Sequence, residues 1–282
     1  MIRLLHPGQS TLQIVDLESL RKKPKALEEA IWVDLLSPTQ EEEEFVETKL
    51  GIETLTKEEM HEIEESSRLF ESNGALYMSC WLISFDAPIP ENTSVTFVMT
   101  PKRFVSMRHS DHHPFRLFCT ESKRVQSHPF QTADEAFVEL IDGVVNQLAA
   151  TLRQIEQSLN GMSMEIFADK TERGQRARNS NLKDVVQRLG KRNALVGNLR
   201  ESAVSFQNIT PFFLNTAADW IHPELTGRLQ TIERDMLSLR EYDAQLSAEI
   251  SFLLDSTIGL INIEQNQSMK ILSVAALLLA FV

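Results

Sequence analysis

The feature that most constrains this chain is a helical pattern that begins near Leu225 and continues to the C-terminal end. Apolar residues return there at alternating steps of four and three, and no proline follows Pro223. The repeating positions are Leu229, Ile232, Met236, Leu239, Leu246, Ile250, Leu253, Thr257 and Leu260, with Asp243 interrupting the series. At about 1.5 Å per residue, a helix of about 58 residues is roughly 85 Å long. It must therefore pack along partner helices or project from its domain.

This heptad-type seam runs directly into an apolar segment. Residues 271–282 carry no charge, and the most polar side chain among them is that of Ser273. A helix needs about 20 apolar residues to cross a bilayer, so this segment provides roughly half a span. We therefore expect one helix that leaves a soluble assembly and enters a membrane.

The first 130 residues mix strand and helix signals. Apolar runs at 31–36, 75–85, 93–100 and 102–109 predict strands, and the last three predict an antiparallel meander with helices packed against it. After the first run, Ser37 predicts a helix N-cap, with Pro38 at the first helical position and Gln40 reaching back, and that helix ends at Gly51. A second capping pattern predicts a helix over about 56–66.

From about residue 132 the pattern is helical. Helices are predicted at 132–168 and 181–208, with a basic turn at 170–181 between them and a short linker bounded by Pro211 and Pro223. The predicted fold class is α+β: an N-terminal α/β domain (1–130) with an antiparallel sheet flanked by helices, two long antiparallel helices (131–222), a very long stalk helix (223–270) and the start of a membrane helix (271–282).

Charge and composition narrow the function classes. A net charge of −12 argues against a nucleic-acid binder, whose affinity comes from phosphate contacts. Residues 26–72 are rich in acids, among them Asp34 and Glu41 to Glu44, which read as a solvated face that could concentrate cations. Cys80 and Cys119 lack CxxC spacing, and no signal-peptide run opens the chain, so we expect a cytoplasmic N-terminal portion. With no recognisable nucleophile, nucleotide-loop or HExxH motif, we predict that it is not an enzyme.

Three segments resemble the CorA family of divalent-cation channels. GLINIEQNQSMKIL (259–272), followed by apolar residues, is similar to the sequence that joins the family's stalk helix to its first transmembrane helix. EEMHEIEESSRLFESNGALYMS (58–79) and IWVDLLSPTQEE (31–42) resemble segments of its N-terminal domain. The family also has a Gly-Met-Asn tripeptide, a second transmembrane helix and a basic C-terminus. Because this sequence has none of them, we expect it to be part of a longer protein.

The resemblance implies a homopentamer in the inner (plasma) membrane, with residues 1–270 in the cytoplasm. It implies Mg²⁺ as the conducted and regulatory ion, with Co²⁺ or Zn²⁺ as further candidates. Five stalk helices would line a pore, and the heptad seam suits such a bundle. Divalent cations bound between neighbouring N-terminal domains would hold the pore closed. Two alternatives stay open: a zinc transporter of the same fold that uses a proton gradient, and a membrane-anchored coiled-coil scaffold.

The resemblance also nominates pore-lining residues. Asp255, in an LLD context near the pore mouth, would form an acidic ring that attracts cations. Asn266 would line the pore with a side-chain carbonyl that binds hydrated Mg²⁺ without holding it tightly. Asn262 and Gln265 are weaker candidates for the same role.

A regulatory metal site is the second implication. His61 and Glu62 stand where the family has a Glu-Asp pair, and the histidine would favour softer metals than Mg²⁺. An ungapped count from MKIL places the partner on Thr231, which is not a carboxylate, so Asp235, one helical turn on, is the candidate partner.

A histidine-rich loop is the last metal-like pattern. His109, Asp111, His112 and His113 are ligand types that zinc accepts. Adjacent histidines usually point apart and no fourth ligand is evident, so the sequence favours a polar loop.

Overall fold

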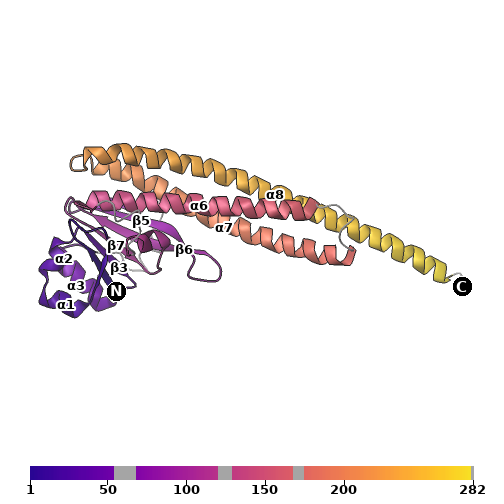
Figure 1. Ribbon diagram of the computed structural model, residues 1–282, viewed down its shortest axis with the longest axis horizontal. Coiled ribbons are helices and arrows are strands. Elements are labelled where there is room, and N and C mark those ends of the chain that lie inside the picture. Colours follow the sequence, from indigo (N-terminus) through magenta and orange to yellow (C-terminus); the bar gives the residue numbers. More distant parts are fainter. Residues whose placement is uncertain (54–67, 120–128, 168–174, 281–282) are drawn as a thin grey trace. The chain divides into compact units, whose positions relative to one another are not determined.

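The computed structural model describes residues 1–53, 68–119, 129–167 and 175–280 and divides into two compact units. The first unit contains Met1–Ala149 and Asn198–Arg240, and the second contains Ala150–Gly197 and Glu241–Val282. Three long helices supply residues to both units: α6 (Ala133–Phe167), α7 (Gln175–Thr216) and α8 (Pro223–Ala280) (Figure 1). The four-segment division expected from the sequence stays a prediction.

Seven strands in the described part of the first unit form one sheet in the order β2-β1-β3-β7-β6-β5-β4. They are β1 (Ile2–Leu5), β2 (Gln13–Val15), β3 (Trp32–Leu36), β4 (Leu69–Ser72), β5 (Ala75–Ser84), β6 (Glu91–Met99) and β7 (Phe104–Arg108). The predicted antiparallel meander is confirmed as β5-β6-β7. The sheet is nevertheless mixed, because β3 and β7 pair in parallel.

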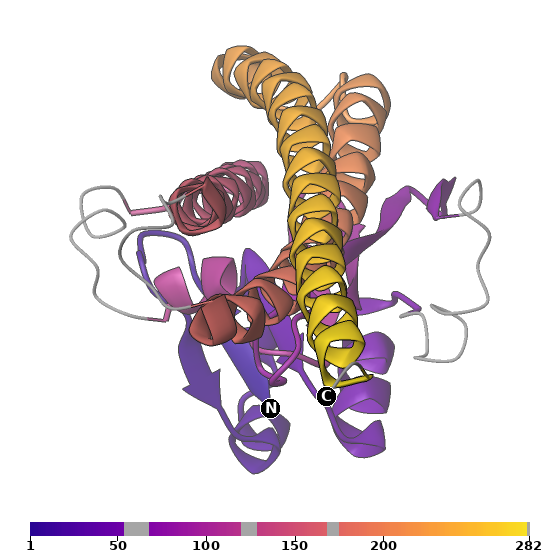
Figure 2. The same cartoon turned by 90° about the vertical axis from the view of Figure 1, so that its right-hand side faces the viewer.

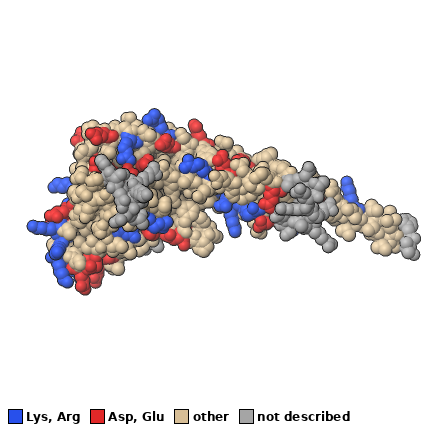
Figure 3. Space-filling model, viewed as in Figure 1, with Lys and Arg blue, Asp and Glu red and all other residues tan. Residues whose placement is uncertain are grey.

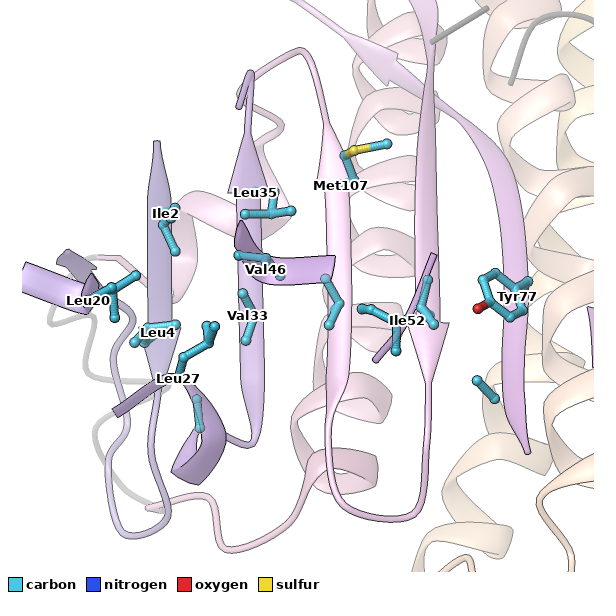
Figure 4. Close-up of a cluster of buried hydrophobic side chains, with 14 residues drawn as sticks. Ile2, Leu4, Leu20, Leu27, Val33, Leu35, Val46, Ile52, Tyr77 and Met107 are labelled. Carbon is cyan, nitrogen blue, oxygen red and sulfur yellow. The ribbon is translucent and has the colours of Figure 1, made fainter. Parts of the chain in front are cut away.

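Strand alternation gives the sheet two apolar faces. Val33 and Leu35 of β3 and Val105 and Met107 of β7 belong to one buried cluster, which also takes residues from α1 (Leu17–Lys22), α2 (Lys25–Glu29) and α3 (Gln40–Leu50) (Figure 4). The alternate residues face an aromatic layer, in which the rings of Phe104 and Phe137 of α6 lie 5.5 Å apart. Figure 2 shows this part of the first unit from a second direction.

The start of α3 differs from the sequence prediction. Thr39, not Ser37, is the N-cap: its hydroxyl accepts from the backbone N–H of Glu42, and the Glu42 carboxylate accepts from the Thr39 backbone N–H. Ser37 has a left-handed φ of 43° and donates its hydroxyl to the His109 carbonyl. The prediction was wrong because two overlapping capping patterns, Ser37 with Gln40 and Thr39 with Glu42, share this segment, and the second closes the box. The predicted end at Gly51 is confirmed, with φ of 66°.

Substitutions of Thr39 and Ser37 are expected to have different effects on stability. Thr39→Ala is expected to cost about 1 kcal/mol of unfolding free energy, the usual value of an N-cap hydroxyl. Ser37→Gly is expected to be neutral or slightly stabilising, because glycine adopts a left-handed φ without strain. Urea unfolding followed by circular dichroism would measure both, and a larger loss for Ser37→Gly would contradict this assignment.

The helix α7 passes through Pro211 rather than ending before it, so the expected linker from Pro211 is wrong. Phe206, Ile209 and Phe213 on either side of the proline are fully buried. Burying each such side chain stabilises by about 1.5–3 kcal/mol, which together exceeds the roughly 3 kcal/mol that an interior proline costs. The chain turns instead at 217–222, and α8 begins at Pro223 as predicted.

The apolar seam of α8 is buried within the chain itself. Every predicted seam position from Leu229 to Thr257 is buried, and Leu260 is half-buried. In the first unit the Arg228 guanidinium of α8 pairs with the Glu139 carboxylate of α6 at 2.7 Å, and in the second the Phe252 ring of α8 stacks with that of Phe167 of α6. The seam therefore packs inside one chain, and its expected use between five copies is wrong.

Candidate pore-lining face and ion-binding residues

A different face of α8 stays exposed in the second unit. Asp255, Asn262 and Asn266 are all exposed. Their spacings of seven and four residues place them within about 40° of one another around the helix axis, on the side away from the buried seam. The structure thus brings the three predicted pore residues onto one solvent-facing line.

The same exposed face carries small residues on the N-terminal side of Asp255, and apolar residues lie next to it around the helix. Ala244 and Ala248 are exposed and lie in the same sector of the helix. Phe252 and Ile263 are 61% and 52% exposed.

The regulatory pair is only partly visible. Asp235 is exposed on α8 in the first unit, so its carboxylate is accessible to a cation. Thr231 donates its hydroxyl to the Gly227 carbonyl and accepts from Arg234. His61 and Glu62 lie outside the described residues, so the structure does not test their contact with Asp235.

The histidine-rich loop does not converge on a metal site. The ring of His112 is buried and bonded at both nitrogens, with Nδ1 3.1 Å from the Ile83 carbonyl and Nε2 3.2 Å from the Thr93 hydroxyl. Asp111 accepts from Arg108, and His113 is exposed. Among the described ranges, no three His, Cys, Asp or Glu side chains are placed to hold a metal ion. The contacts of Asp111 and His112 instead hold the loop between β7 and α5 (His113–Leu117) in place.

His112 makes the first unit sensitive to acid. Burial, together with the nearby Arg108 charge, lowers the pKa of His112 to about 4. The unfolded chain takes up a proton near the ordinary histidine pKa of about 6.5, so stability falls as the pH drops below that value. We expect His112→Gln to flatten the acid side of a plot of thermal midpoint (Tm) against pH. An unchanged profile would contradict this.

A buried ion-pair network on the sheet was not predicted. Asp34 and Arg108 are both fully buried, and Arg108 donates to the two Asp34 carboxylate oxygens from Nε at 3.0 Å and from a terminal nitrogen at 2.8 Å. Ser106 donates its hydroxyl to Asp34 at 2.7 Å and accepts from the Trp32 indole N–H. Asp34 therefore does not belong to a solvated acidic face, and that expectation was wrong for this residue.

Strand register explains the network. Arg3 of β1 stands opposite Asp34 of β3, and Asp34 stands opposite Ser106 of β7, so one row of the sheet is polar. Arg108 reaches back along its strand into that row and stacks over the Phe115 ring at 4.1 Å. The sequence signal for this network lies in WVDLL (32–36), where the charged Asp34 stands within an otherwise apolar strand and shares a face with Trp32.

The C-terminal part of α8 is the candidate membrane span. Among the helices that the structure describes, α8 is long and apolar enough to cross a bilayer. Figure 3 shows its end without charged side chains beyond the last basic one. Residues 271–280 are exposed throughout, as expected of side chains that face lipid.

An α+β unit and long helices that lead to one candidate span are the arrangement of a membrane protein with a large portion outside the bilayer. The sequence model of the CorA family, described as CorA-like Mg²⁺ transporter protein, matches residues 28–280. The chain therefore belongs to the CorA family.

Individual relatives agree with this assignment. The magnesium transport protein CorA of Haemophilus ducreyi is 27% identical over 281 residues, covering 99% of this chain and 84% of the relative. The magnesium transport protein CorA of Escherichia coli is 26% identical over 260 residues, covering 90% and 78%. The expected resemblance is confirmed by both the family and these relatives.

Solved structures show the same fold. The complete CorA magnesium transporter of Methanocaldococcus jannaschii superposes with a TM-score of 0.70 at 16% identity, covering 97% of this chain and 81% of that one. The ZntB cytoplasmic domain of Vibrio parahaemolyticus gives 0.55 at 10% identity, covering 82% and 87%. At these identities the similarity concerns the fold alone.

Proposed function

We propose that this chain forms the cytoplasmic domain and pore-lining stalk of a homopentameric Mg²⁺ channel in the inner membrane. The family and the named magnesium transport relatives support transport of Mg²⁺ rather than an enzymatic reaction. The observation that carries the proposal is the exposed line of Asp255, Asn262 and Asn266 on α8, whose opposite side is already packed.

The chemistry of this line fits Mg²⁺ as the transported ion. Mg²⁺ prefers oxygen ligands and gives up its water reluctantly, so carboxylate and amide oxygens that contact its hydration shell suit passage better than a tight cage. Five copies of Asp255 would form a ring that attracts cations, and Asn262 and Asn266 would follow toward the membrane. Co²⁺ and Zn²⁺ are further candidate ions, which the same assay separates.

Two measurements test this function with the protein expressed from its native gene. Native mass spectrometry in detergent is expected to give five copies. Vesicles that contain the protein and a Mg²⁺-sensitive dye are expected to take up Mg²⁺ faster than empty vesicles. Another stoichiometry, or uptake of Zn²⁺ in preference to Mg²⁺, would overturn the proposal in favour of a scaffold or a zinc transporter.

We also infer regulation by a cytoplasmic divalent cation that involves Asp235, with Glu62 and His61 as its partners. An exposed carboxylate on each side of a contact between copies, bridged by Mg²⁺, makes that contact depend on the ion. This inference rests on the exposure of Asp235 and on the acidic character of residues 58–65.

Regulatory binding predicts a stabilising effect of Mg²⁺. A ligand at ten times its Kd stabilises the folded state by about 1.4 kcal/mol, which raises Tm by a few degrees. The shift is expected to shrink in Asp235→Asn and to persist in Asp219→Asn, a control acid that is exposed in the turn before α8. Differential scanning calorimetry measures both, and equal shifts in the two variants would contradict the role of Asp235.

A further inference from the structure

A histidine and a buried aspartate join the starts of two long helices in the first unit. Asp134 lies in the first turn of α6 and its side chain is only 4% exposed. Its carboxylate oxygen Oδ2 accepts from the backbone N–H of His222 at 2.9 Å and lies 2.8 Å from His222 Nδ1. His222 immediately precedes Pro223, the first residue of α8.

This contact lies directly before α8 and therefore affects how that helix begins. The His222 carbonyl accepts from the Leu225 N–H, so the same residue that holds Asp134 also closes the first turn of α8. The turn between α7 and α8 is only six residues long (217–222), and the Trp220 ring is packed edge-on against Phe213 of α7. The Asp134–His222 contact and the Phe213–Trp220 ring contact thus both hold the turn that leads into α8.

The charges around His222 are acidic. Of the described residues, Asp134 and Glu135 of α6 and Glu224 of α8 act on it. The hydrogen bond and charge of Asp134 raise the pKa of His222. Burial alone would raise the pKa of Asp134, but the side chain of Thr132 and the hydrogen bonds from His222 hold it below its ordinary value. The imidazole side chain is 56% exposed, so protons reach it from solvent.

We propose that the Asp134–His222 contact is a proton-sensitive clamp on the start of α8. A neutral imidazole donates one hydrogen bond from Nδ1 to the carboxylate. Protonation keeps that bond and adds the attraction between two opposite charges. Acidification of the surrounding solution therefore tightens the attachment of α8 to the first turn of α6, and alkalinisation loosens it. This clamp is independent of which ion the protein transports.

The sign of the effect on stability follows from linkage. Because the pKa of His222 is higher in the folded state, its contribution is complete below the unfolded value of about 6.5 and disappears as the pH rises through the folded pKa. His112 acts in the opposite direction, so the total pH profile mixes the two. A comparison between variants that keep His112 removes this overlap.

The test uses the full chain in detergent with histidine ring carbons labelled for NMR. The His222 titration midpoint is expected at a higher pH in the wild type than in Asp134→Asn, whose amide oxygen still accepts the backbone N–H. Hydrogen exchange at the backbone N–H groups in the first turns of α8 is expected to slow as the pH falls below the His222 titration midpoint, after correction for the intrinsic exchange rate. In His222→Asn, a neutral donor, that additional protection is expected to be lost.

A matched control and a second measurement keep the test decisive. His113→Asn replaces an exposed histidine of the same unit and is expected to leave the protection of α8 unchanged. If Asp134→Asn does not fold, the Tm difference between wild type and His222→Asn decides: it should be larger near pH 5.5 than near pH 8.5, on either side of the ordinary histidine pKa of about 6.5. Equal midpoints, or a pH-independent Tm difference, would overturn the clamp.

Discussion

Replacing Arg108 with methionine is expected to remove about 3–5 kcal/mol of unfolding free energy, because it leaves the Asp34 carboxylate buried without its principal partner. Domains of ordinary size have a total stability of about 5–15 kcal/mol. Arg3 cannot compensate, since its guanidinium nitrogen lies 3.5 Å from Asp34 and is shared with Asp111. The variant should therefore lose a large share of its stability and unfold at a clearly lower urea concentration than the wild type.

Two further variants give this prediction its control. Arg116→Met removes another arginine that pairs with Asp111, but its side chain is 46% exposed, so a loss of about 0–1 kcal/mol is expected. The double variant Asp34→Leu/Arg108→Met removes both charges of the pair and leaves Arg3 with Asp111 as its partner, so it should recover part of the stability that the single change loses. Urea denaturation followed by tryptophan fluorescence measures all three, and a loss below about 1 kcal/mol for Arg108→Met would show that the network is dispensable.

Substitution of Asn266 by leucine is expected to slow Mg²⁺ uptake roughly tenfold or more. If five copies line a pore, the change replaces a ring of amide oxygens by an apolar constriction, which does not stabilise a hydrated ion. A barrier increase of about 1.4 kcal/mol is sufficient for a tenfold loss of rate. Asp255→Asn should have a smaller effect, concentrated at low ion concentration, because a ring at the entrance mainly raises the local cation concentration.

The control for Asn266 is its neighbour Gln267. Gln267 is an exposed amide one residue on, about 100° around the helix and therefore off the line of Asp255 and Asn262. Gln267→Leu is expected to leave uptake within about twofold of wild type, a barrier change of well under 1 kcal/mol. Stopped-flow dye measurements in vesicles, normalised to the amount of protein inserted, would compare the two. Equal losses would place the pore on another face of α8.

The sequence predicted much of the fold because its strongest signals are periodic. The seam of α8 and the meander β5-β6-β7 were both read from spacing alone. Apart from the N-cap of α3, which is a local error, the predictions that were wrong depended on contacts far away in the sequence. Pro211 is accommodated because aromatic residues of α7 are buried on both sides of it. The parallel pairing of β3 with β7 joins strands whose sequence positions give no direction signal.

The candidate site shows the same limit. The family resemblance nominated Asp255, Asn262 and Asn266, and the structure added that they share one exposed line of α8. Their roles in a pore stay predictions. The Asp34–Arg108 and Asp134–His222 contacts were missed, because their partners are separated by 74 and 88 residues. No local pattern in the sequence connects such pairs.

The burial of the α8 seam within one chain has a consequence for how copies would separate. If the apolar side of a stalk helix were buried only against neighbouring copies, separation of the copies would expose that side to water. Each square ångström of apolar surface so exposed costs about 25 cal/mol. This helix is already covered by its own chain along that side. In the proposed assembly, neighbouring stalks would therefore separate without exposing this seam to water.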